Sequence, residues 1–179
     1  MSRMTERLPW YVLTGGPCGG KTTTIAALNK RGYPILKEAA REVIDEMLAQ
    51  GKSLDLIRGD PDWFQKTVLR RKVAMESLVP QDHEYFFDRG IPDSIAYYRE
   101  NAVAEDEELW NACRLFRYGK VFLLDLIDFS ADEARNESPE LAKRLHTAIE
   151  SGYKELGYNI VHIPVMPVES RVDFILANL

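Results

Sequence analysis

The feature that most constrains the fold of this chain is the segment Gly15-Gly16-Pro17-Cys18-Gly19-Gly20-Lys21-Thr22. It fits the pattern G-x-x-x-x-G-K-[ST], in which glycines let successive backbone N–H groups turn toward an anionic phosphate without Cβ clashes. In this pattern the lysine ammonium reaches the β- and γ-phosphates, and the hydroxyl of Thr22 is placed to bind Mg²⁺. With Thr23, which follows, the segment predicts a site for a nucleotide polyphosphate.

The sequence on either side of this segment supports the prediction. Residues 10–14 are apolar and β-prone and read as a buried strand, while residues 21–31 have a helical pattern that ends before Gly32. A phosphate loop requires strand, loop and helix in that order, and the positive N-terminal end of the helix favours an anion. The alternative is a glycine-rich turn with an incidental lysine.

Composition excludes several other classes of protein. A chain of 179 residues, 45% apolar and 28% charged, is expected to form one domain spanning residues 1–179. The net charge of −5 argues against an extended nucleic-acid surface. No apolar run is long enough to span a membrane, and no secretory signal is recognisable, so a cytoplasmic location is expected. Two cysteines and three scattered histidines provide neither a disulfide framework nor a zinc site.

Strand and helix patterns alternate along the whole chain. Strands are predicted near 10–14, 33–36, 84–87, 120–125 and 159–163, and helices near 21–31, 38–50, 61–79, 92–100, 105–117, 138–156 and 168–178. Strands separated by helices indicate βαβ crossovers, hence a mainly parallel sheet covered by helices on both faces. The sequence therefore predicts a three-layer α/β domain.

Two carboxylates compete for the role of Mg²⁺ ligand opposite Thr22. Asp88 ends the strand near 84–87, and ligands bind beyond the carboxyl ends of strands in open α/β sheets. Asp125 ends a similar run, but two more apolar residues follow it and the strand can continue past it. Asp88 is preferred because Arg89 and a glycine follow it, which adds a cation beside the phosphates.

Glu38 follows the second predicted strand, where a carboxylate would face the transferred phosphate and orient or deprotonate an acceptor hydroxyl. The alternative is a first-turn glutamate that complements the helix dipole. Arg41, one turn further on, can contact substrate or pair with Glu38. The basic cluster of residues 70–72 is interpreted as the solvated face of a helix.

A polar segment near residues 127–138 separates the fourth strand from a long helix and is the predicted lid. Within it, Arg135 can deliver a planar, charged fork to phosphate oxygens as charge develops on them. Closing such a lid would exclude water from the reaction. The alternative is an ordinary surface loop.

Several of these segments together resemble a known family, the small AAA-like P-loop domains of the kinase superfamily. They are Thr14-Gly15-Gly16-Pro17, Gly20-Lys21-Thr22, Glu38-Ala39-Ala40-Arg41-Glu42, Phe87-Asp88-Arg89-Gly90-Ile91-Pro92-Asp93, Asp132-x-x-Arg135-x-Glu137, Leu156-Gly157-Tyr158 and Val168-Glu169-Ser170-Arg171-Val172. Relatives include the ribosylnicotinamide kinase domain of bacterial NAD-salvage regulators and an insect trafficking protein that binds GTP and phosphoinositides. The resemblance implies a five-stranded sheet in the order 2-3-1-4-5 and a lid carrying Arg135. One departure is Cys18-Gly19-Gly20, where many relatives carry serine.

The expected function is transfer of a phosphoryl group from ATP, with Mg²⁺, to a small hydroxyl-bearing, nucleoside-like metabolite. Lys21, Glu38, Asp88 and Arg135 are the predicted catalytic residues, Glu38, Arg41 and Arg89 the predicted substrate contacts, and Thr22 and Asp88 the predicted metal ligands. GTP stays possible as the donor. The alternative is a nucleotide-gated binding module that acts on a protein or phospholipid partner, and a nucleic-acid-coupled ATPase is disfavoured by the acidic composition.

Overall fold

The computed structural model describes residues 7–127 and 138–179 and shows a parallel sheet of five strands in the order β2-β3-β1-β4-β5. The strands are β1 (Leu8–Thr14), β2 (Ile35–Leu36), β3 (Tyr85–Asp88), β4 (Tyr118–Leu124) and β5 (Ile160–Ile163). All four strand pairs are parallel. The predicted fold class and strand order are therefore confirmed.

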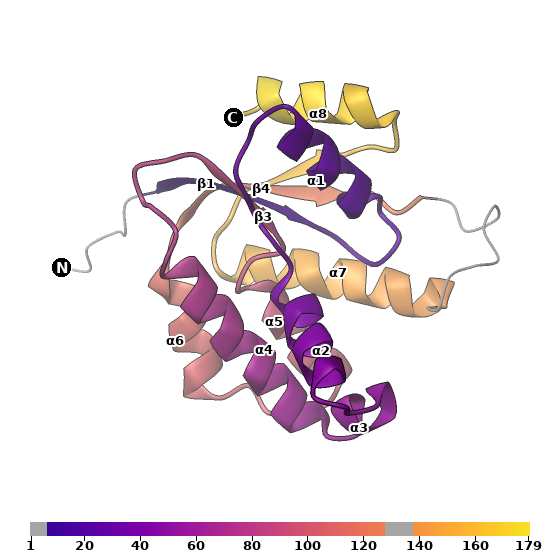
Figure 1. Ribbon diagram of the computed structural model, residues 1–179. Helices are drawn as coiled ribbons and strands as arrows, with labels where there is room; N and C mark the ends of the chain where they lie inside the picture. The colour runs from indigo at the N-terminus through magenta and orange to yellow at the C-terminus, as the bar shows by residue number, and fades with distance from the viewer. Residues whose placement is uncertain (1–6, 128–137) are drawn as a thin grey trace.

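Helices cover both faces of this sheet (Figure 1). Helices α1 (Lys21–Lys30) and α8 (Val168–Ala177) pack side by side on one face. The other face carries α5 (Asp93–Glu100) and α7 (Pro139–Glu155), with α2 (Ala39–Ala49), α3 (Leu54–Arg58), α4 (Pro61–Glu76) and α6 (Glu107–Leu115) further from the sheet. Helix α4 joins this group together because it packs against α2, α3, α5 and α6.

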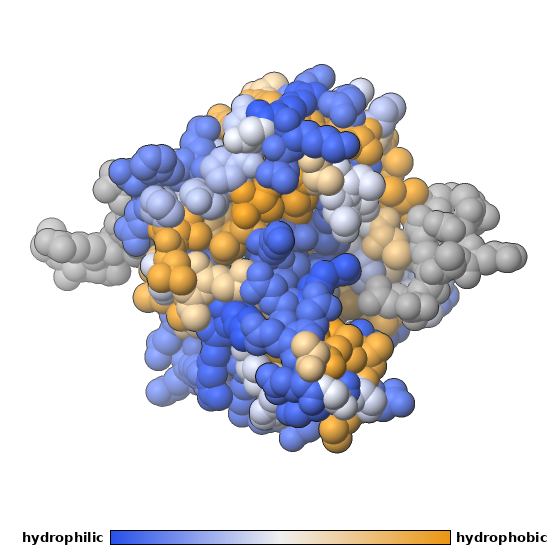
Figure 2. Space-filling view, viewed as in Figure 1, coloured by the Kyte–Doolittle hydropathy of each residue, from blue (hydrophilic) through white to orange (hydrophobic). Residues whose placement is uncertain are grey.

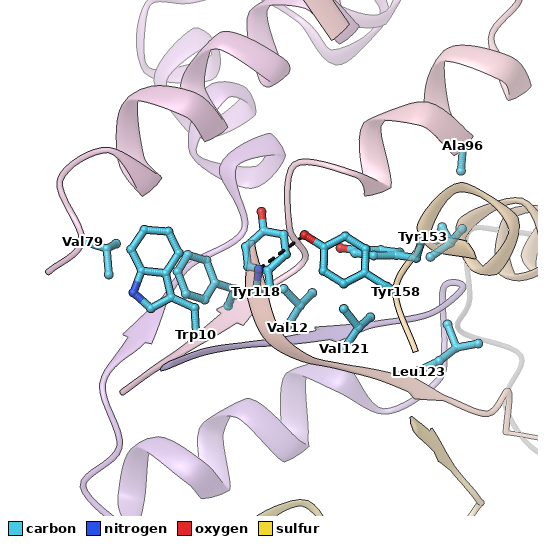
Figure 3. Packing of buried hydrophobic residues seen from close by; sticks show 11 residues of the cluster. Trp10, Val12, Val79, Ala96, Tyr118, Val121, Leu123, Tyr153 and Tyr158 are labelled. Atoms are coloured by element: carbon cyan, nitrogen blue, oxygen red, sulfur yellow. Dashed lines mark hydrogen bonds between the residues drawn. The ribbon is translucent and has the colours of Figure 1, made fainter. Parts of the chain in front are cut away.

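The two faces of β1 explain the two halves of the core. Trp10 and Val12 point to the α5 and α7 face, where they pack with Phe87, Tyr118 and Tyr153 (Figure 3). Tyr11 and Leu13, the alternate residues of β1, point to the other face, where they pack among side chains of α1 and α8. This period of two is expected for a central strand buried on both sides. Burial of both sets fixes the register of β1 and with it the position of the loop that follows.

Local sequence signals mark the ends of several helices. The side chains of Asp60 and Ser138 accept hydrogen bonds from the backbone N–H groups of Trp63 and Leu141, so both are N-caps. Gly157 follows α7 with a φ of 73°, the left-handed conformation that commonly ends a helix. The structure adds one helix that the sequence did not predict, the short α3, which begins after the N-cap Ser53.

Candidate active site

The phosphate loop, residues 15–22, connects β1 to α1 at the carboxyl edge of the sheet. Two of its glycines are required because the loop passes close to neighbouring backbone. A Cβ on Gly15, whose φ is 130°, would lie 2.7 Å from the carbonyl oxygen of Leu124. A Cβ on Gly16 would lie 2.5 Å from the carbonyl oxygen of Ala142 in α7. The loop is therefore pressed between the end of β4 and α7.

Lys21 is 8% exposed and lies inside this loop. Its Nζ donates hydrogen bonds to the carbonyl oxygens of Gly15, at 2.9 Å, and Gly16, at 2.6 Å. Burial and the nearby charge of Arg89 lower the pKa of Lys21 to about 7, against the opposing effect of nearby carboxylates. An anion placed beside the ammonium would favour its charged form.

Arg89 lies directly after β3, in a left-handed backbone conformation with φ of 67°. Its Nε donates to Oε1 of Glu38 at 3.0 Å, and its Nη1 donates to the carbonyl oxygen of Gly15 at 3.0 Å and to Oδ1 of Asp93 at 3.2 Å. Burial lowers the pKa of Arg89, but the surrounding groups outweigh burial and raise the pKa overall. This buried cation thus joins the ends of β1, β2 and β3.

The two carboxylates considered for Mg²⁺ lie in different surroundings. Asp88 ends β3 and lines the same cavity as Thr22; burial and the charge of Glu38 raise its pKa to about 6. Asp125 is 43% exposed, and its Oδ1 lies 3.7 Å from Nδ1 of His162. The expectation that β4 can continue past Asp125 is wrong, because β4 ends at Leu124. Of the two, Asp88 lines the cavity beside the phosphate loop and Asp125 does not.

Two cavities meet at this edge of the sheet. The phosphate cavity, of about 470 Å³, is lined by Pro17, Cys18, Gly20, Lys21, Thr22, Thr23, Glu38, Arg41, Asp88, Arg89, Tyr97 and Ile127. The helical cavity, of about 610 Å³, opens among α2, α3, α4, α5 and α7 and is lined by Glu38, Ala40, Arg41, Ile44, Asp45, Arg58, Pro61, Phe64, Gln65, Val68, Lys72, Arg89, Ser94, Tyr97, Glu100, Asn101, Leu141 and Leu145. Both linings include the same four residues, Glu38, Arg41, Arg89 and Tyr97. The structure thus brings the predicted substrate contacts to the boundary between the cavities.

A family model described as an AAA domain matches residues 10–171, which is most of the chain. The chain belongs to the AAA domain family. The resemblance found in the sequence is thereby confirmed. A comparison with curated proteins finds no match.

Solved structures with the same fold as this AAA domain include a deoxyadenosine kinase from M. mycoides, with a TM-score of 0.66, 18% sequence identity and coverage of 94% of this chain and 97% of that one. A thymidylate kinase from Ehrlichia chaffeensis gives a TM-score of 0.66 at 14% identity, with coverage of 94% and 97%. The NadR protein in complex with NR gives a TM-score of 0.63 at 16% identity, with coverage of 86% of this chain and 43% of that one. At these identities the likeness establishes the fold.

Behind the site, the AAA domain contains a buried polar network that sequence reasoning missed. Asp93 accepts hydrogen bonds from Thr14, Arg89, Tyr153 and the backbone N–H of Gly90. Buried Lys72 donates to the carbonyl oxygen of Gly90 at 2.9 Å and to Oγ of Ser94 at 3.2 Å. The interpretation of residues 70–72 as a solvated face is therefore wrong for Lys72, which reaches α5 from α4.

Other sequence expectations have different outcomes. Arg135 and nearly all of the predicted lid, residues 128–137, lie outside the described residues, so their role stays a prediction. Glu38 is the N-cap residue of α2, but its side chain bonds Arg89 rather than the helix end. Arg41 lines both cavities and makes no ion pair with Glu38 in the described part of the chain.

Two negative findings apply to residues 7–127 and 138–179. No cluster of three or more histidine, cysteine or carboxylate side chains is arranged to hold a metal ion. Within the same ranges, none of the helices has both the length and the apolar character required to cross a bilayer. On the face seen in Figure 2, hydrophobic residues form patches separated by hydrophilic ones.

Proposed function

We propose that this AAA domain transfers a phosphoryl group from ATP to the hydroxyl group of a small, nucleoside-like metabolite. The observation that carries this proposal is the shared wall of the two cavities, formed by Glu38, Arg41, Arg89 and Tyr97. A plain NTPase needs a phosphate cavity alone. A second cavity that meets the first at a carboxylate and two guanidinium groups provides a place for an acceptor beside the phosphates.

On the donor side, the loop amides and Lys21 would hold the β- and γ-phosphates. The negative phosphates would favour the charged form of Lys21 and draw its Nζ away from the carbonyl oxygens that it now contacts. Mg²⁺ fits the oxygen donors of Thr22 and Asp88, because this ion binds proteins through one or two carboxylates and completes its shell with phosphates and water. When bound, Mg²⁺ would neutralise charge on the phosphate oxygens.

On the acceptor side, Glu38 would accept a hydrogen bond from the reacting hydroxyl and orient its oxygen toward the γ-phosphate. Arg89 supports this role because its Nε holds Oε1 of Glu38 at 3.0 Å while its Nη1 contacts the phosphate loop at Gly15. Arg41, on the same wall, provides a further cation for the transferred group.

The helical cavity supports an acceptor with a ring. Its volume of about 610 Å³ lies within the usual range for small-molecule sites. Phe64 and Tyr97 bring aromatic surface, and Gln65, which is 7% exposed, brings an amide. The names of three proteins with this fold, deoxyadenosine kinase, thymidylate kinase and NadR with bound NR, favour the same class of acceptor.

The acceptor is tested by incubating the protein with labelled ATP, or GTP, Mg²⁺ and a panel of nucleosides, nucleotides, vitamins and sugars. We expect one compound to receive the label, and Glu38→Gln to abolish transfer while ATP binding persists. Glu42→Gln is the matched control, because Glu42 lies on the same helix and lines neither cavity. If no compound accelerates ATP loss, the nucleotide-gated module becomes the better assignment.

The donor side is tested separately with Lys21→Ala. The variant is expected to lose ATP binding without unfolding, because the hydrogen bonds that Nζ of Lys21 makes within the described residues are to carbonyl oxygens of the loop itself. The control is Lys30→Ala, at the exposed end of the same helix. Unchanged ATP affinity in Lys21→Ala, measured by calorimetry, would remove Lys21 from the mechanism.

A further inference from the structure

Arg171 of α8 lies behind the phosphate loop and is 3% exposed. Its Nη1 donates to the carbonyl oxygens of Gly19, at 3.3 Å, and Gly20, at 3.2 Å, and to Oγ1 of Thr24 at 3.1 Å. Its Nη2 donates to the carbonyl oxygen of Met166 at 3.2 Å, in the turn after β5. One side chain therefore connects the phosphate loop, α1 and the turn that precedes α8.

This guanidinium is unusual because no carboxylate among the described residues balances its charge. Among residues 7–127 and 138–179, Arg171 forms no ion pair with a carboxylate, and its Nε is buried without a hydrogen-bond partner. Burial lowers the pKa of Arg171. Buried arginines are normally paired, because an unpaired charge away from water is costly. A buried, unpaired arginine against a loop rich in glycine points to a role in that loop.

The hydrogen bonds of Arg171 reach two peptide groups of the loop. The carbonyl oxygen of Gly20 also accepts from the backbone N–H of Thr24, at 3.2 Å, and from the hydroxyls of Thr23 and Thr24, at 2.9 Å, so α1 already fixes its direction. Within the described residues, the carbonyl oxygen of Gly19 has no donor besides Arg171.

In a trans peptide the C=O and the following N–H point in opposite directions. Since the carbonyl oxygens of Gly19 and Gly20 point toward Arg171, the N–H groups of Gly20 and Lys21 point away from it. Gly20 and Lys21 both line the phosphate cavity, and Gly20 has the left-handed conformation, with φ of 77°, found in anion-binding nests.

We propose that Arg171 is a positioning residue that holds the peptide group between Gly19 and Gly20 with its N–H toward the bound polyphosphate. It also adds a fixed positive charge behind the loop, which a polyphosphate would balance. The ligand class is the polyphosphate chain itself, whatever base it carries, because every contact of Arg171 with the loop is to backbone or to Thr24. The inference rests on the proposed function only in that the loop must bind a polyphosphate.

The expected effect is on affinity. Without Arg171 the peptide group between Gly19 and Gly20 is free to take other orientations, and the apparent dissociation constant rises by the inverse of the fraction that stays competent. If one molecule in ten keeps the competent loop, binding weakens about tenfold. Binding of ATP and binding of inorganic tripolyphosphate should weaken by the same factor, since the base makes no contact with Arg171.

The test measures binding of ATP and of inorganic tripolyphosphate by calorimetry, with melting temperature as a separate readout. Arg171→Met should weaken the binding of both ligands about tenfold or more. Arg171→Lys, which keeps the charge but lacks the planar guanidinium with its two terminal nitrogens, should give an intermediate loss of affinity. The matched control is Arg31→Met: Arg31 also ties α1 to α8, through ion pairs of 2.6 Å with Glu169 and Asp173, but it does not touch the loop. This control should bind both ligands within about twofold of wild type.

Each other result overturns the inference. If Arg171→Met binds both ligands as wild type does, or if Arg31→Met loses as much affinity as Arg171→Met, Arg171 only packs α8 against α1 and does not position the loop. Loss of ATP binding with retained tripolyphosphate binding would mean that Arg171 acts on the base and not on the polyphosphate. If Arg171→Met does not fold, wild-type affinity in Arg171→Lys would show that the planar guanidinium is not needed. If wild type binds neither ligand, the proposed function fails and not this inference alone.

Discussion

At the residue scale, Arg89 is placed by three separate partners. Its Nε contacts Glu38, and its Nη1 contacts both the Gly15 carbonyl and Asp93. A lysine ammonium at the same place cannot reproduce this planar fork. We expect Arg89→Lys to lower phosphoryl transfer about 100-fold, because Glu38 and the phosphate loop lose their common support. Transfer within about threefold of wild type, measured with labelled ATP, would contradict this role.

The buried carboxyl of Glu76 leads to a prediction about pH. It accepts a hydrogen bond of 2.7 Å from the hydroxyl of Tyr118, and burial raises its pKa from 4.5 to about 8. Because the pKa is higher in the folded than in the unfolded chain, the folded protein holds more protons between these values. Its contribution to stability is therefore complete below pH 4.5 and is lost as the pH rises toward 8.

Glu76→Gln replaces this carboxyl with an amide that does not ionise. The variant should match wild type at pH 5 and exceed its free energy of unfolding by about 1 kcal/mol or more at pH 9. Denaturant unfolding at several pH values measures the difference. Parallel pH profiles of the two proteins would show that Glu76 is already ionised in the folded state near neutral pH.

Residues that act through long-range contacts were the ones that sequence reasoning missed. Lys72 belongs to a basic cluster whose other two members form surface ion pairs, and no local pattern distinguishes it from them. Its burial follows from the packing of α4 on α5, which brings its Nζ to the Gly90 carbonyl. Gln65 and Arg171 were missed for the same reason. The phosphate loop and Asp88 were predictable because their positions follow from the strand–loop–helix order and from the carboxyl edge of the sheet.

At the element scale, the strands and all but one of the helices could be predicted because each carries its own signals. Caps at Asp60 and Ser138 and the glycine after α7 mark their helices in the sequence. Helix α3 was not predictable in this way, because its five residues are too few to show a helical period and lie between Gly51 and Gly59. It is held by Ser53 and by burial of Ile57, a tertiary contact.

The contact between the phosphate loop and α7 also belongs to this scale. A methyl group on Gly16 would meet the backbone carbonyl oxygen of Ala142 at 2.5 Å, and backbone cannot rotate away as a side chain can. Gly16→Ala should therefore lower the free energy of unfolding by about 1–3 kcal/mol and weaken tripolyphosphate binding as the loop is displaced. Gly32→Ala is the control, since Gly32 has a φ of 89° but no atom within 4 Å of an added Cβ. It should lose stability while it keeps affinity; equal affinity in both variants would contradict the argument.

At the scale of the whole molecule, the two cavities belong to different parts of the fold. The phosphate cavity is built by the carboxyl edge of the sheet and the loops that leave it, whereas the helical cavity is built mainly by α2 to α5 and α7. The predicted sheet therefore located the first cavity. The second depends on how helices far apart in the sequence cross one another, and residues 51–80 carry no motif that reveals it.

This division predicts that substrate affinities can be changed one at a time. Gln65 lies on α4, lines the helical cavity and takes no part in the phosphate cavity. Within the described parts of the chain its amide makes no hydrogen bond, and neither of its polar atoms is fully buried, so both can bond an acceptor in the helical cavity. Gln65→Leu keeps similar volume without the amide. It should raise the KM for the acceptor about tenfold or more, because a good hydrogen bond to the acceptor is lost, and leave the KM for ATP within about twofold. Steady-state transfer assays that vary each substrate in turn would measure both constants. A parallel rise in the KM for ATP would mean that the two cavities act as one site, and an unchanged acceptor KM would place the acceptor elsewhere.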